Sequence, residues 1–450
     1  MKNHYRPVSQ WLAAPPDTPV LSRAGHITTA TGLAQQVKSL YARLRQHPAE
    51  CCVLCFRDCG HFIAALLAVL HAGKRPVLPG SHDPSLCLPL PEGENSLLLT
   101  DGSLPPDSEG WFTPHEQNIP ASEISLPDIP ADSILTLYTS GSGGTPKRVD
   151  KTVSVMDCEV RWLAECRRDK PDAVYVRSSV SHQHLYGLTF RVWLPLSLGL
   201  VTDIIPAEFP EQLPFPEPYI FITSPAFLQF IDHTLAPPHW SLIISAGGKL
   251  SDQLADATQH WGNTVIYEIY GSTETGVVAR RERHESDNNW RPFAGVTLTA
   301  AEEPSRYYLT SALLASSVPF LLDDKLSIAP DGRFTLTGRA DNILKIGEKR
   351  ISVTAVENLL TGHPAISEAA VVPVNRGGRT YLGAVIVTGQ TMSDQKISQS
   401  ALFTQLRAFL RGNTDPLAIP RFWRVVPSIP LNPQSKRSWA VLQELFNVAD

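Results

Sequence analysis

The chain has 450 residues, of which 43% are hydrophobic and 18% charged, a composition that excludes a disordered protein, a collagen-like fibre and a coiled coil. Its 39 basic and 44 acidic side chains leave a net charge of −5, without the basic surplus of a nucleic-acid-binding protein. The longest apolar run, residues 62–70, is far shorter than the roughly 20 residues that span a membrane, and residues 1–11 lack the apolar core of a secretory signal. The seven cysteines are few, so we expect a cytoplasmic protein. The length of 450 residues indicates two or three domains.

The greater part of the chain predicts a large α/β domain in which strands alternate with helices. Residues 33–45 carry leucine and valine at helical spacing, residues 51–56 read as a short buried strand, and residues 62–71 predict a buried helix. Further apolar runs of strand length follow at residues 134–139, 173–177, 200–205, 219–223, 242–246 and 265–270. Ser251 is a candidate helix cap between two of them. Strands that are apolar on both faces indicate mostly parallel sheets covered by helices, and we assign this N-terminal domain to residues 1–338.

The C-terminal part predicts a small, mobile α+β domain over residues 342–450, after a hinge at residues 339–341. Its expected elements are a helix at 353–360, strands at 369–374 and 381–387, and a helix at 401–410. From Arg339 onward the chain holds 13 Lys and Arg against 8 Asp and Glu, so this domain is basic while the rest is acidic. A basic surface favours an acidic partner, with a merely solvated face as the alternative.

A glycine-rich segment follows the strand predicted at residues 134–139. Its candidate binding residues are Thr139, Ser140, Gly141, Ser142, Gly143, Gly144 and Lys147. Backbone N–H groups and hydroxyls in such a loop suit a polyphosphate. The segment is not a P-loop, because Pro146 precedes the lysine and Arg148 follows it. Taken alone, it could equally be a Gly/Ser linker.

Three further segments carry recognisable chemistry. Residues 270–276, YGSTETG, place a hydroxyl and a carboxylate side by side at the end of a strand, a pair that suits a phosphate oxygen and its Mg²⁺. Residues 338–345, GRADNILK, lie at the proposed domain junction, and residues 429–436, IPLNPQSK, end in an isolated lysine. In this order, the four segments resemble the ANL superfamily of adenylate-forming enzymes, which includes acyl- and aryl-CoA ligases, nonribosomal-peptide adenylation domains and firefly-type luciferases. The resemblance runs from about residue 28 to the end of the chain.

The resemblance implies ATP and Mg²⁺ as cofactors and a role for each matching residue. The glycine-rich loop would grip the phosphates, Thr273 would bind the α-phosphate, and Glu274 would be the Mg²⁺ ligand. Lys436 would reach into the site and stabilise the charge that builds up during adenylation. Rotation about the hinge residue Asp341 would later exchange this lysine for a face that carries Lys345. The remaining nucleotide contacts are expected from Gly247, Gly248, Tyr270, Gly271, Ser272, Asp324 and Arg339.

Three positions depart from the family pattern. Gly143 stands where threonine is usual, and Glu348 and Ser435 stand where glycine is usual. An inactive homologue would also be expected to lose Glu274 or Lys436, and both are present. We therefore expect an active ligase, with a nucleotide-binding pseudoenzyme as an alternative.

The acid substrate is indicated by residues 181–188, SHQHLYGL. They resemble the F-H-x-x-G-L stretch of acyl- and aryl-CoA ligases, with His184 at the family's histidine, and they lack the aspartate with which amino-acid adenylation domains hold an amino group. An aryl or acyl acid is therefore favoured. Packing of one histidine, His182 or His184, is the alternative to a functional role for both. The cysteines from Cys51 to Cys59 fit a buried strand and helix better than a zinc site.

The acceptor is indicated by the size of the chain, which is short for the superfamily. It resembles the compact ligases that accompany aryl polyene and related pigment clusters, which load an acid onto an acyl carrier protein. We therefore expect activation of an aryl or acyl carboxylic acid as its acyl-adenylate, followed by transfer to a phosphopantetheine thiol. An acyl carrier protein is favoured as the acceptor, and an acyl- or aryl-CoA ligase that uses CoA is the alternative.

Overall fold

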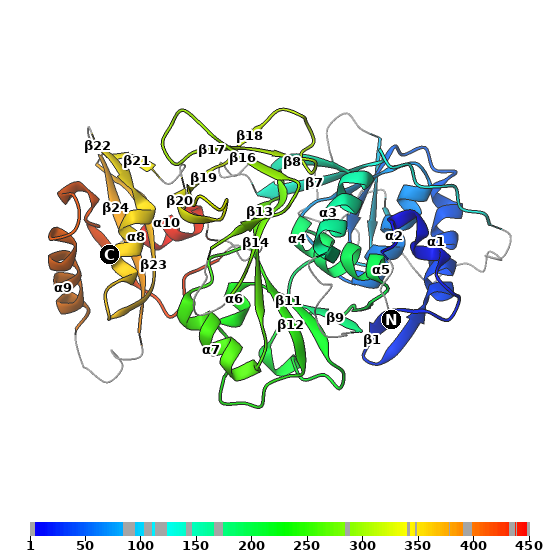
Figure 1. Ribbon diagram of the computed structural model, residues 1–450, viewed down its shortest axis with the longest axis horizontal. Coiled ribbons are helices and arrows are strands. Elements are labelled where there is room, and N and C mark those ends of the chain that lie inside the picture. Colours follow the sequence, from blue (N-terminus) through cyan, green and yellow to red (C-terminus); the bar gives the residue numbers. More distant parts are fainter. Residues whose placement is uncertain are drawn as a thin grey trace. The chain divides into compact units, whose positions relative to one another are not determined.

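A computed structural model describes most of the chain. It covers residues 5–83, 95–102, 110–112, 124–140, 146–165, 174–283, 289–339, 343–346, 349–377, 379–389, 398–431, 437 and 439–447. The chain divides into a larger unit, Met1–Thr297 with Thr310–Phe320, and a smaller unit, Leu298–Leu309 with Leu321–Asp450. Figure 1 follows both units along the chain. None of the described helices is both long and apolar enough to cross a membrane.

The first sheet of the larger unit is built around the buried strand β3 (Cys51–Cys55). Among the described residues the sheet order is β6 (Gly110–Phe112), β5 (Ser96–Thr100), β3, β4 (Arg75–Leu78), β7 (Ile134–Ser140) and β8 (Pro146–Thr152). All neighbours are parallel except β7 and β8, which are antiparallel. The helices α1 (Ala30–Leu44) and α2 (Cys59–His71) pack on this part of the chain, and α2 begins where the Asp58 carboxylate accepts from His61 N–H at 2.9 Å.

The second sheet of the larger unit is also mainly parallel. Its described order is β15 (Arg291–Pro292), β14 (Gly276–Glu282), β13 (Ile266–Ser272), β12 (Trp240–Ser245), β11 (Tyr219–Thr223), β9 (Tyr175–Ser178), β10 (Val201–Asp203), β1 (Pro19–Arg23) and β2 (His26–Thr29). The accompanying helical segments are η1 (Val8–Ala13), α3 (Val153–Glu165), α4 (Leu185–Gly187), η4 (Leu188–Trp193), α5 (Leu194–Leu198), η5 (Pro210–Gln212), α6 (Pro225–Leu228) and α7 (Asp252–Gly262). Strands β1, β10, β9, β11, β12 and β13 run parallel, so the predicted α/β class with parallel sheets is confirmed.

One hydrophobic core holds the two sheets together. It includes Phe62 of α2, Leu137 of β7, Met156 of α3, Trp193 of η4 and Ile222 of β11, all of them at most 1% exposed. The run from Leu185 to Leu198 is helical and largely apolar, which is why it lies inside this core rather than on the surface.

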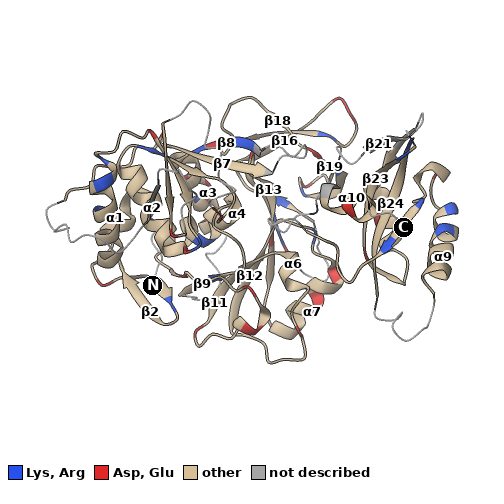
Figure 2. Cartoon of the chain, turned by 180° about the vertical axis from the view of Figure 1, so that it is seen from behind, with Lys and Arg blue, Asp and Glu red and all other residues tan. Residues whose placement is uncertain are grey.

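The smaller unit is built on a three-stranded sheet, β23 (Ile366–Arg376), β24 (Arg379–Thr388) and β25 (Phe422–Val425). Side chains alternate between its faces, so Val371 joins a core with α8 (Val353–Thr361) and α9 (Gln399–Arg411), while Val372 joins a second core with α10 (Trp439–Asn447). The remaining described elements are the hairpins β19 (Asp324–Ile328) with β20 (Phe334–Arg339) and β21 (Ile343–Ile346) with β22 (Lys349–Ser352), the strands β16 (Val296–Ala300), β17 (Tyr307–Ser311) and β18 (Phe320–Leu321), and η7 (Pro416–Ala418). The expectation of a small C-terminal domain that contains both helices and strands is confirmed, and Figure 2 shows basic residues on its helix α9.

Candidate functional site

The glycine-rich segment is framed by the two antiparallel strands of the first sheet. Strand β7 ends at Ser140 and β8 begins at Pro146, and Thr139 stands opposite Lys147 in the register. The predicted phosphate contacts at Gly141, Ser142, Gly143 and Gly144 lie outside the described residues and stay predictions. The described part of the motif therefore consists of its two flanks, which deliver Thr139 and Lys147 to neighbouring positions.

The segment at residues 270–276 forms the connection from β13 to β14. The N–H of Ser272 donates to Thr275 Oγ1 at 3.0 Å, and the N–H of Thr275 donates to Ser272 Oγ at 3.2 Å. A side chain on Gly271 would collide with the chain, because a Cβ there would lie 2.2 Å from the carbonyl oxygen of Gly276. The turn is therefore compact, and it presents Thr273 and Glu274 beyond the end of a parallel strand, where ligands of α/β sheets usually bind.

The structure brings these two motifs into contact. Lys147 Nζ lies 2.8 Å from Glu274 Oε1, although the two residues are 127 positions apart in the chain. Partial burial acts to raise the pKa of Glu274, but the hydrogen bond and the charge of Lys147 outweigh it and hold the pKa below its ordinary value. Glu274 is therefore ionised at neutral pH, and a single carboxylate of this kind suits Mg²⁺, which usually takes one or two carboxylates together with substrate phosphates.

Strand β12 ends just before Gly247 and Gly248, two of the predicted nucleotide contacts, and β11 is its parallel neighbour. Tyr186 Oη lies 2.9 Å from the carbonyl oxygen of Thr223 and 2.8 Å from that of Ile244, so this half-buried tyrosine ties the two strand ends to α4. Gly247 has a φ of +88°, a left-handed conformation that favours glycine. The nucleotide contacts predicted for Gly247, Gly248, Tyr270, Gly271 and Ser272 stay predictions.

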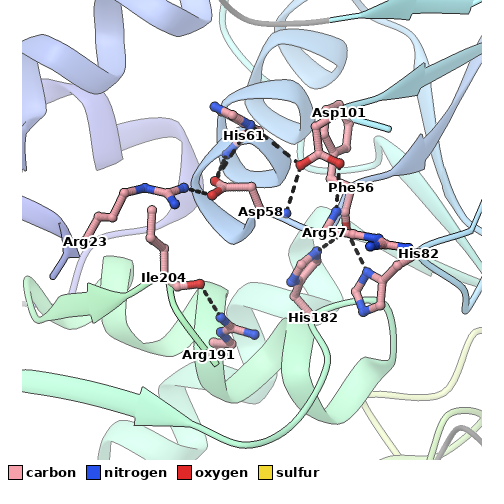
Figure 3. Close-up of polar contacts among 10 residues, drawn as sticks. All are labelled: Arg23, Phe56, Arg57, Asp58, His61, His82, Asp101, His182, Arg191 and Ile204. Atoms are coloured by element: carbon pink, nitrogen blue, oxygen red, sulfur yellow. Dashed lines mark hydrogen bonds and ion pairs between the residues drawn. The ribbon is translucent and has the colours of Figure 1, made fainter. Parts of the chain in front are cut away.

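The two histidines of this segment differ in burial, and Figure 3 shows the buried one, His182. His182 is fully buried and its Nε2 lies 3.1 Å from the Phe56 carbonyl oxygen, which also receives His82 Nδ1 at 2.6 Å. Burial, reinforced by the charge of Arg191 and by His82, lowers the pKa of His182 well below its ordinary value. His182 is thus a neutral core histidine, the packing alternative that the sequence left open for one of the two.

His184 differs from its neighbour because it is only half-buried. It precedes α4, and a Cβ on Gly80 would lie 3.4 Å from its Cε1 atom, so the ring rests against the loop after β4. Gly187 lets the helix approach this segment, since a Cβ there would lie 1.9 Å from the Ser181 carbonyl oxygen. The proposed role of His184 at the acid substrate stays a prediction.

The cysteines from Cys51 to Cys59 are buried and are not joined in disulfides. Three lie in β3 and the last begins α2. Burial raises the pKa of Cys52 to about 12 and also raises that of Cys59, so neither is a reactive thiolate at neutral pH. Within the described ranges, no cluster of His, Cys, Asp and Glu has the arrangement of a metal site.

Two of the predicted nucleotide contacts of the smaller unit face each other. Asp324 and Arg339 are register partners across the β19–β20 hairpin. A guanidinium nitrogen of Arg339 also lies 3.7 Å from a carboxylate oxygen of Asp323. Lys345 lies on β21, whereas Asp341 and Lys436 fall outside the described residues, so the hinge and the adenylation lysine stay predictions.

Two charged residues behind the Glu274 turn were missed in the sequence. Lys151 of β8 and Glu159 of α3 are each only 2% exposed. Lys151 Nζ donates to the main-chain oxygen of Glu274 at 2.8 Å, and Glu159 accepts from the N–H of Val277 at 2.8 Å. The available signal was the spacing of Lys147 and Lys151 by four residues, which places both on one face of a strand.

Comparison with known proteins agrees with this architecture. A family model described as AMP-binding enzyme matches residues 8–303, and one described as AMP-binding enzyme C-terminal domain matches residues 355–436. The chain belongs to the AMP-binding enzyme family.

Individual relatives of this family member are distant. A 4-coumarate–CoA ligase of Halorhodospira halophila is 27% identical over 275 residues, which span 60% of this chain and 66% of that protein. A D-alanine–D-alanyl carrier protein ligase of Staphylococcus epidermidis is 24% identical over 354 residues, 70% of this chain and 72% of that protein. The benzoate CoA ligase of Burkholderia xenovorans LB400 superposes with a TM-score of 0.74 at 19% identity, over 97% of this chain and 99% of that one, a likeness of fold.

Proposed function

We propose that this AMP-binding family member uses ATP to activate an aryl or acyl carboxylic acid as its acyl-adenylate and then transfers the acyl group to a phosphopantetheine thiol. The observation that carries the proposal is the 2.8 Å contact between Lys147 and Glu274, which joins the phosphate-type loop to the acidic turn. A cation and an ionised carboxylate at one place are the groups that a nucleotide triphosphate and its Mg²⁺ require.

The chemistry follows from the charges of the reactants. A carboxylate oxygen of the acid attacks the α-phosphorus of ATP, a new P–O bond forms, and the bond to pyrophosphate breaks. Lys147 and the donors of the glycine-rich loop hold the phosphates, and the hydroxyl of Thr273 binds the α-phosphate. Mg²⁺ held at Glu274 would neutralise phosphate charge when bound. Lys436 supplies a further positive charge where negative charge accumulates.

The second half-reaction needs a different arrangement, because a thiol must now reach the acyl carbon. The thiol loses its proton to solvent and its sulfur bonds to that carbon, while the bond from the carbon to the AMP oxygen breaks and AMP leaves with the bonding electrons. We propose that rotation at Asp341 withdraws Lys436 and brings the face with Lys345 to the site. Asp324 and Arg339 would hold the ribose, and Gly247, Gly248, Tyr270, Gly271 and Ser272 would line the nucleoside in both steps. The register pairing of Asp324 with Arg339 supports a shared role.

We propose an acyl carrier protein as the acceptor, as in the compact ligases of aryl polyene clusters. The basic smaller unit supports this, since Arg411 and Arg421 are exposed and carrier proteins are acidic. The carrier protein ligase among the relatives is consistent with such an acceptor. CoA is the second candidate, favoured by the 4-coumarate–CoA ligase relatives. Competition between holo-carrier and CoA separates the two, and a salt-insensitive preference for the carrier would count against charge docking.

Exchange of labelled pyrophosphate into ATP tests the proposal. We expect exchange with members of a panel of benzoates, cinnamates and fatty acids, and none with amino acids. In this proposal His184 lies beside the bound acid. Exchange with amino acids alone would identify an amino-acid adenylation domain. Binding of ATP without exchange for any acid would identify a pseudoenzyme, and either result would overturn the proposal.

A further inference from the structure

Lys151 is a buried lysine whose partners lie on two other segments of the larger unit. It stands near the end of β8, 2% exposed, and its Nζ donates to the carbonyl oxygens of Glu274 at 2.8 Å and Leu313 at 2.9 Å. Burial lowers its pKa, against the opposing charges of Glu159 and Glu274. Because removing an ammonium from water is costly, such a residue needs a compensating role in the fold or in the site.

Glu159 also contacts the main chain of this turn, from the other side. One carboxylate oxygen accepts from the N–H of Val277 at 2.8 Å, and the other accepts from Thr189 Oγ1 at 2.7 Å. Gly276 makes this approach possible, because a Cβ there would lie only 2.8 Å from Glu159 Oε1. The main chain from Glu274 to Val277 is therefore held from behind by a buried cation at one end and a buried anion at the other.

Strand β8 therefore contacts Glu274 through two different lysines. Lys147 and Lys151 are four positions apart and point to the same face of the strand. Lys147 contacts the carboxylate of Glu274, and Lys151 contacts its main-chain oxygen, each at 2.8 Å. The two lysines differ in accessibility, since the side chain of Lys147 is 57% exposed while Lys151 is 2% exposed.

The difference matters once phosphates enter the site. Lys147 is the cation that the incoming phosphates would attract, and its contact with Glu274 must then loosen. A carboxylate released in this way would lose its fixed position unless its main chain were held by something that the nucleotide does not disturb. Lys151 is such a group, because it is sealed from solvent and bound to two carbonyl oxygens.

We propose that Lys151 and Glu159 are positioning residues, which fix the main chain of the Thr273–Val277 turn so that Glu274 keeps its place when Lys147 moves to the phosphates. This rests on the proposed role of Glu274 as the carboxylate for the nucleotide's divalent cation. Lys151 and Glu159 touch neither substrate nor cation in this account, and they act only through the turn.

The quantity that tests this proposal is the factor by which Mg²⁺ strengthens ATP binding, measured by calorimetry with and without the metal. A loss of folded protein lowers the number of sites but leaves this factor unchanged, so the ratio separates positioning from stability. In Lys151→Met we expect the factor to fall about tenfold, the worth of a hydrogen bond to a charged group. ATP affinity without metal should stay near the wild-type value.

A second variant guards against misfolding of the first. Lys151→Met leaves Glu159 without its opposing charge, so Lys151→Met/Glu159→Gln, which removes both buried charges, is measured beside it. The matched control is Arg177→Met/Asp203→Asn, which removes a buried 2.8 Å ion pair of the same unit, outside the turn. We expect the Mg²⁺ factor to fall in the first double variant and to stay at the wild-type value in the control.

The outcomes distinguish this inference from the proposed function. If Glu274→Gln keeps the wild-type Mg²⁺ factor, the role of Glu274 fails and the positioning proposal fails with it. If Glu274→Gln loses the factor while the Lys151→Met/Glu159→Gln variant keeps it, only the positioning proposal is overturned. Loss in both, with the control unchanged, supports the two together.

Discussion

The side chains of Lys147 and Glu274 form an ion pair with a separation of 2.8 Å, joining a strand of the first sheet to a turn of the second. Lys147 belongs to β8 at the edge of the first sheet, and Glu274 follows β13 of the second. Lys147 and Glu274 belong to two separate sequence motifs. Their contact brings these motifs together in one candidate phosphate site.

Removal of Lys147 should affect chemistry far more than stability. The pair is partly exposed, and exposed pairs contribute about 1 kcal/mol or less. In Lys147→Met we therefore expect pyrophosphate exchange to fall about a hundredfold, the typical loss of one fixed charge contact to a transition state. The midpoint of urea unfolding should move little. A large fall in the midpoint with exchange intact would contradict the assignment.

Gly276 is expected to tolerate no side chain. Its φ is +67°, and a Cβ would also crowd Glu159, so Gly276→Ala should lower the free energy of unfolding by about 1–3 kcal/mol. Gly25→Ala is the matched control, since Gly25 has a φ of +85° with open space around it. Denaturant unfolding measures the loss of unfolding free energy in both variants, and the difference between the two losses reports the crowding. Equal losses would show that Glu159 does not press on the turn.

Asp157 should make stability depend on pH in an uncommon direction. Burial raises its pKa, although hydrogen bonds from Trp193 at 2.8 Å and from the N–H of Val8 at 3.3 Å oppose the shift. An acid whose folded-state pKa is raised contributes stability that is present below its ordinary pKa and is lost as pH rises through the folded value. Asp157→Asn keeps an acceptor oxygen for both donors and removes the charge.

We therefore expect Asp157→Asn to be at least as stable as wild type at neutral pH. Its unfolding free energy should also fall less than that of wild type as pH rises from about 4 toward 7. Chemical denaturation at several pH values measures both quantities. A variant that is less stable at neutral pH, with the wild-type slope retained, would show that the carboxylate is held as an anion.

The basic smaller unit should matter for the carrier protein and not for the nucleotide. Arg411 is exposed at the end of α9, and Arg411→Glu should raise KM for an acidic holo-carrier severalfold at low salt while pyrophosphate exchange is unchanged. Arg45→Glu, an exposed change in the larger unit, is the control. An equal effect of both variants would indicate a general charge effect rather than a docking surface.

Lys436 should be needed for one half-reaction only. Lys436→Ala is expected to lower the rate of acyl-adenylate formation by a hundredfold or more, because one fixed charge at the transition state is worth about 3 kcal/mol. Thioester formation from a supplied acyl-adenylate should be spared. Loss of both half-reactions to the same degree would argue against the exchange of faces at the hinge.

Elements with a strong apolar signal were predictable from the sequence. The runs at residues 51–56, 219–223 and 265–270 became β3, β11 and β13, because strands buried on both faces need continuous apolar side chains. Ser251 caps α7 as expected, accepting from Leu254 N–H at 3.2 Å. In the smaller unit, β25 was not predicted because it has only four residues, and α10 was not predicted either.

Strand β8 shows why part of the site escaped prediction. Its sequence, PKRVDKT, is mostly charged and carries no apolar alternation, and the strand exists because it pairs with β7 from Thr152 opposite Ile134 to Pro146 opposite Ser140. A charged residue in such a run reads as solvent-facing. Lys151 can be buried because the fold places the carbonyl oxygens of Glu274 and Leu313 beside it. The pattern of residues along the chain does not indicate those partners.

The most direct test of the whole account follows the oxygen atoms of the acid. The enzyme is supplied with ATP, Mg²⁺, a thiol acceptor and an aryl acid whose carboxylate carries oxygen-18, and the products are weighed by mass spectrometry. Attack of the carboxylate on the α-phosphorus predicts one labelled oxygen in AMP and the other in the thioester. Unlabelled AMP, or label in inorganic phosphate together with ADP, would contradict adenylate formation.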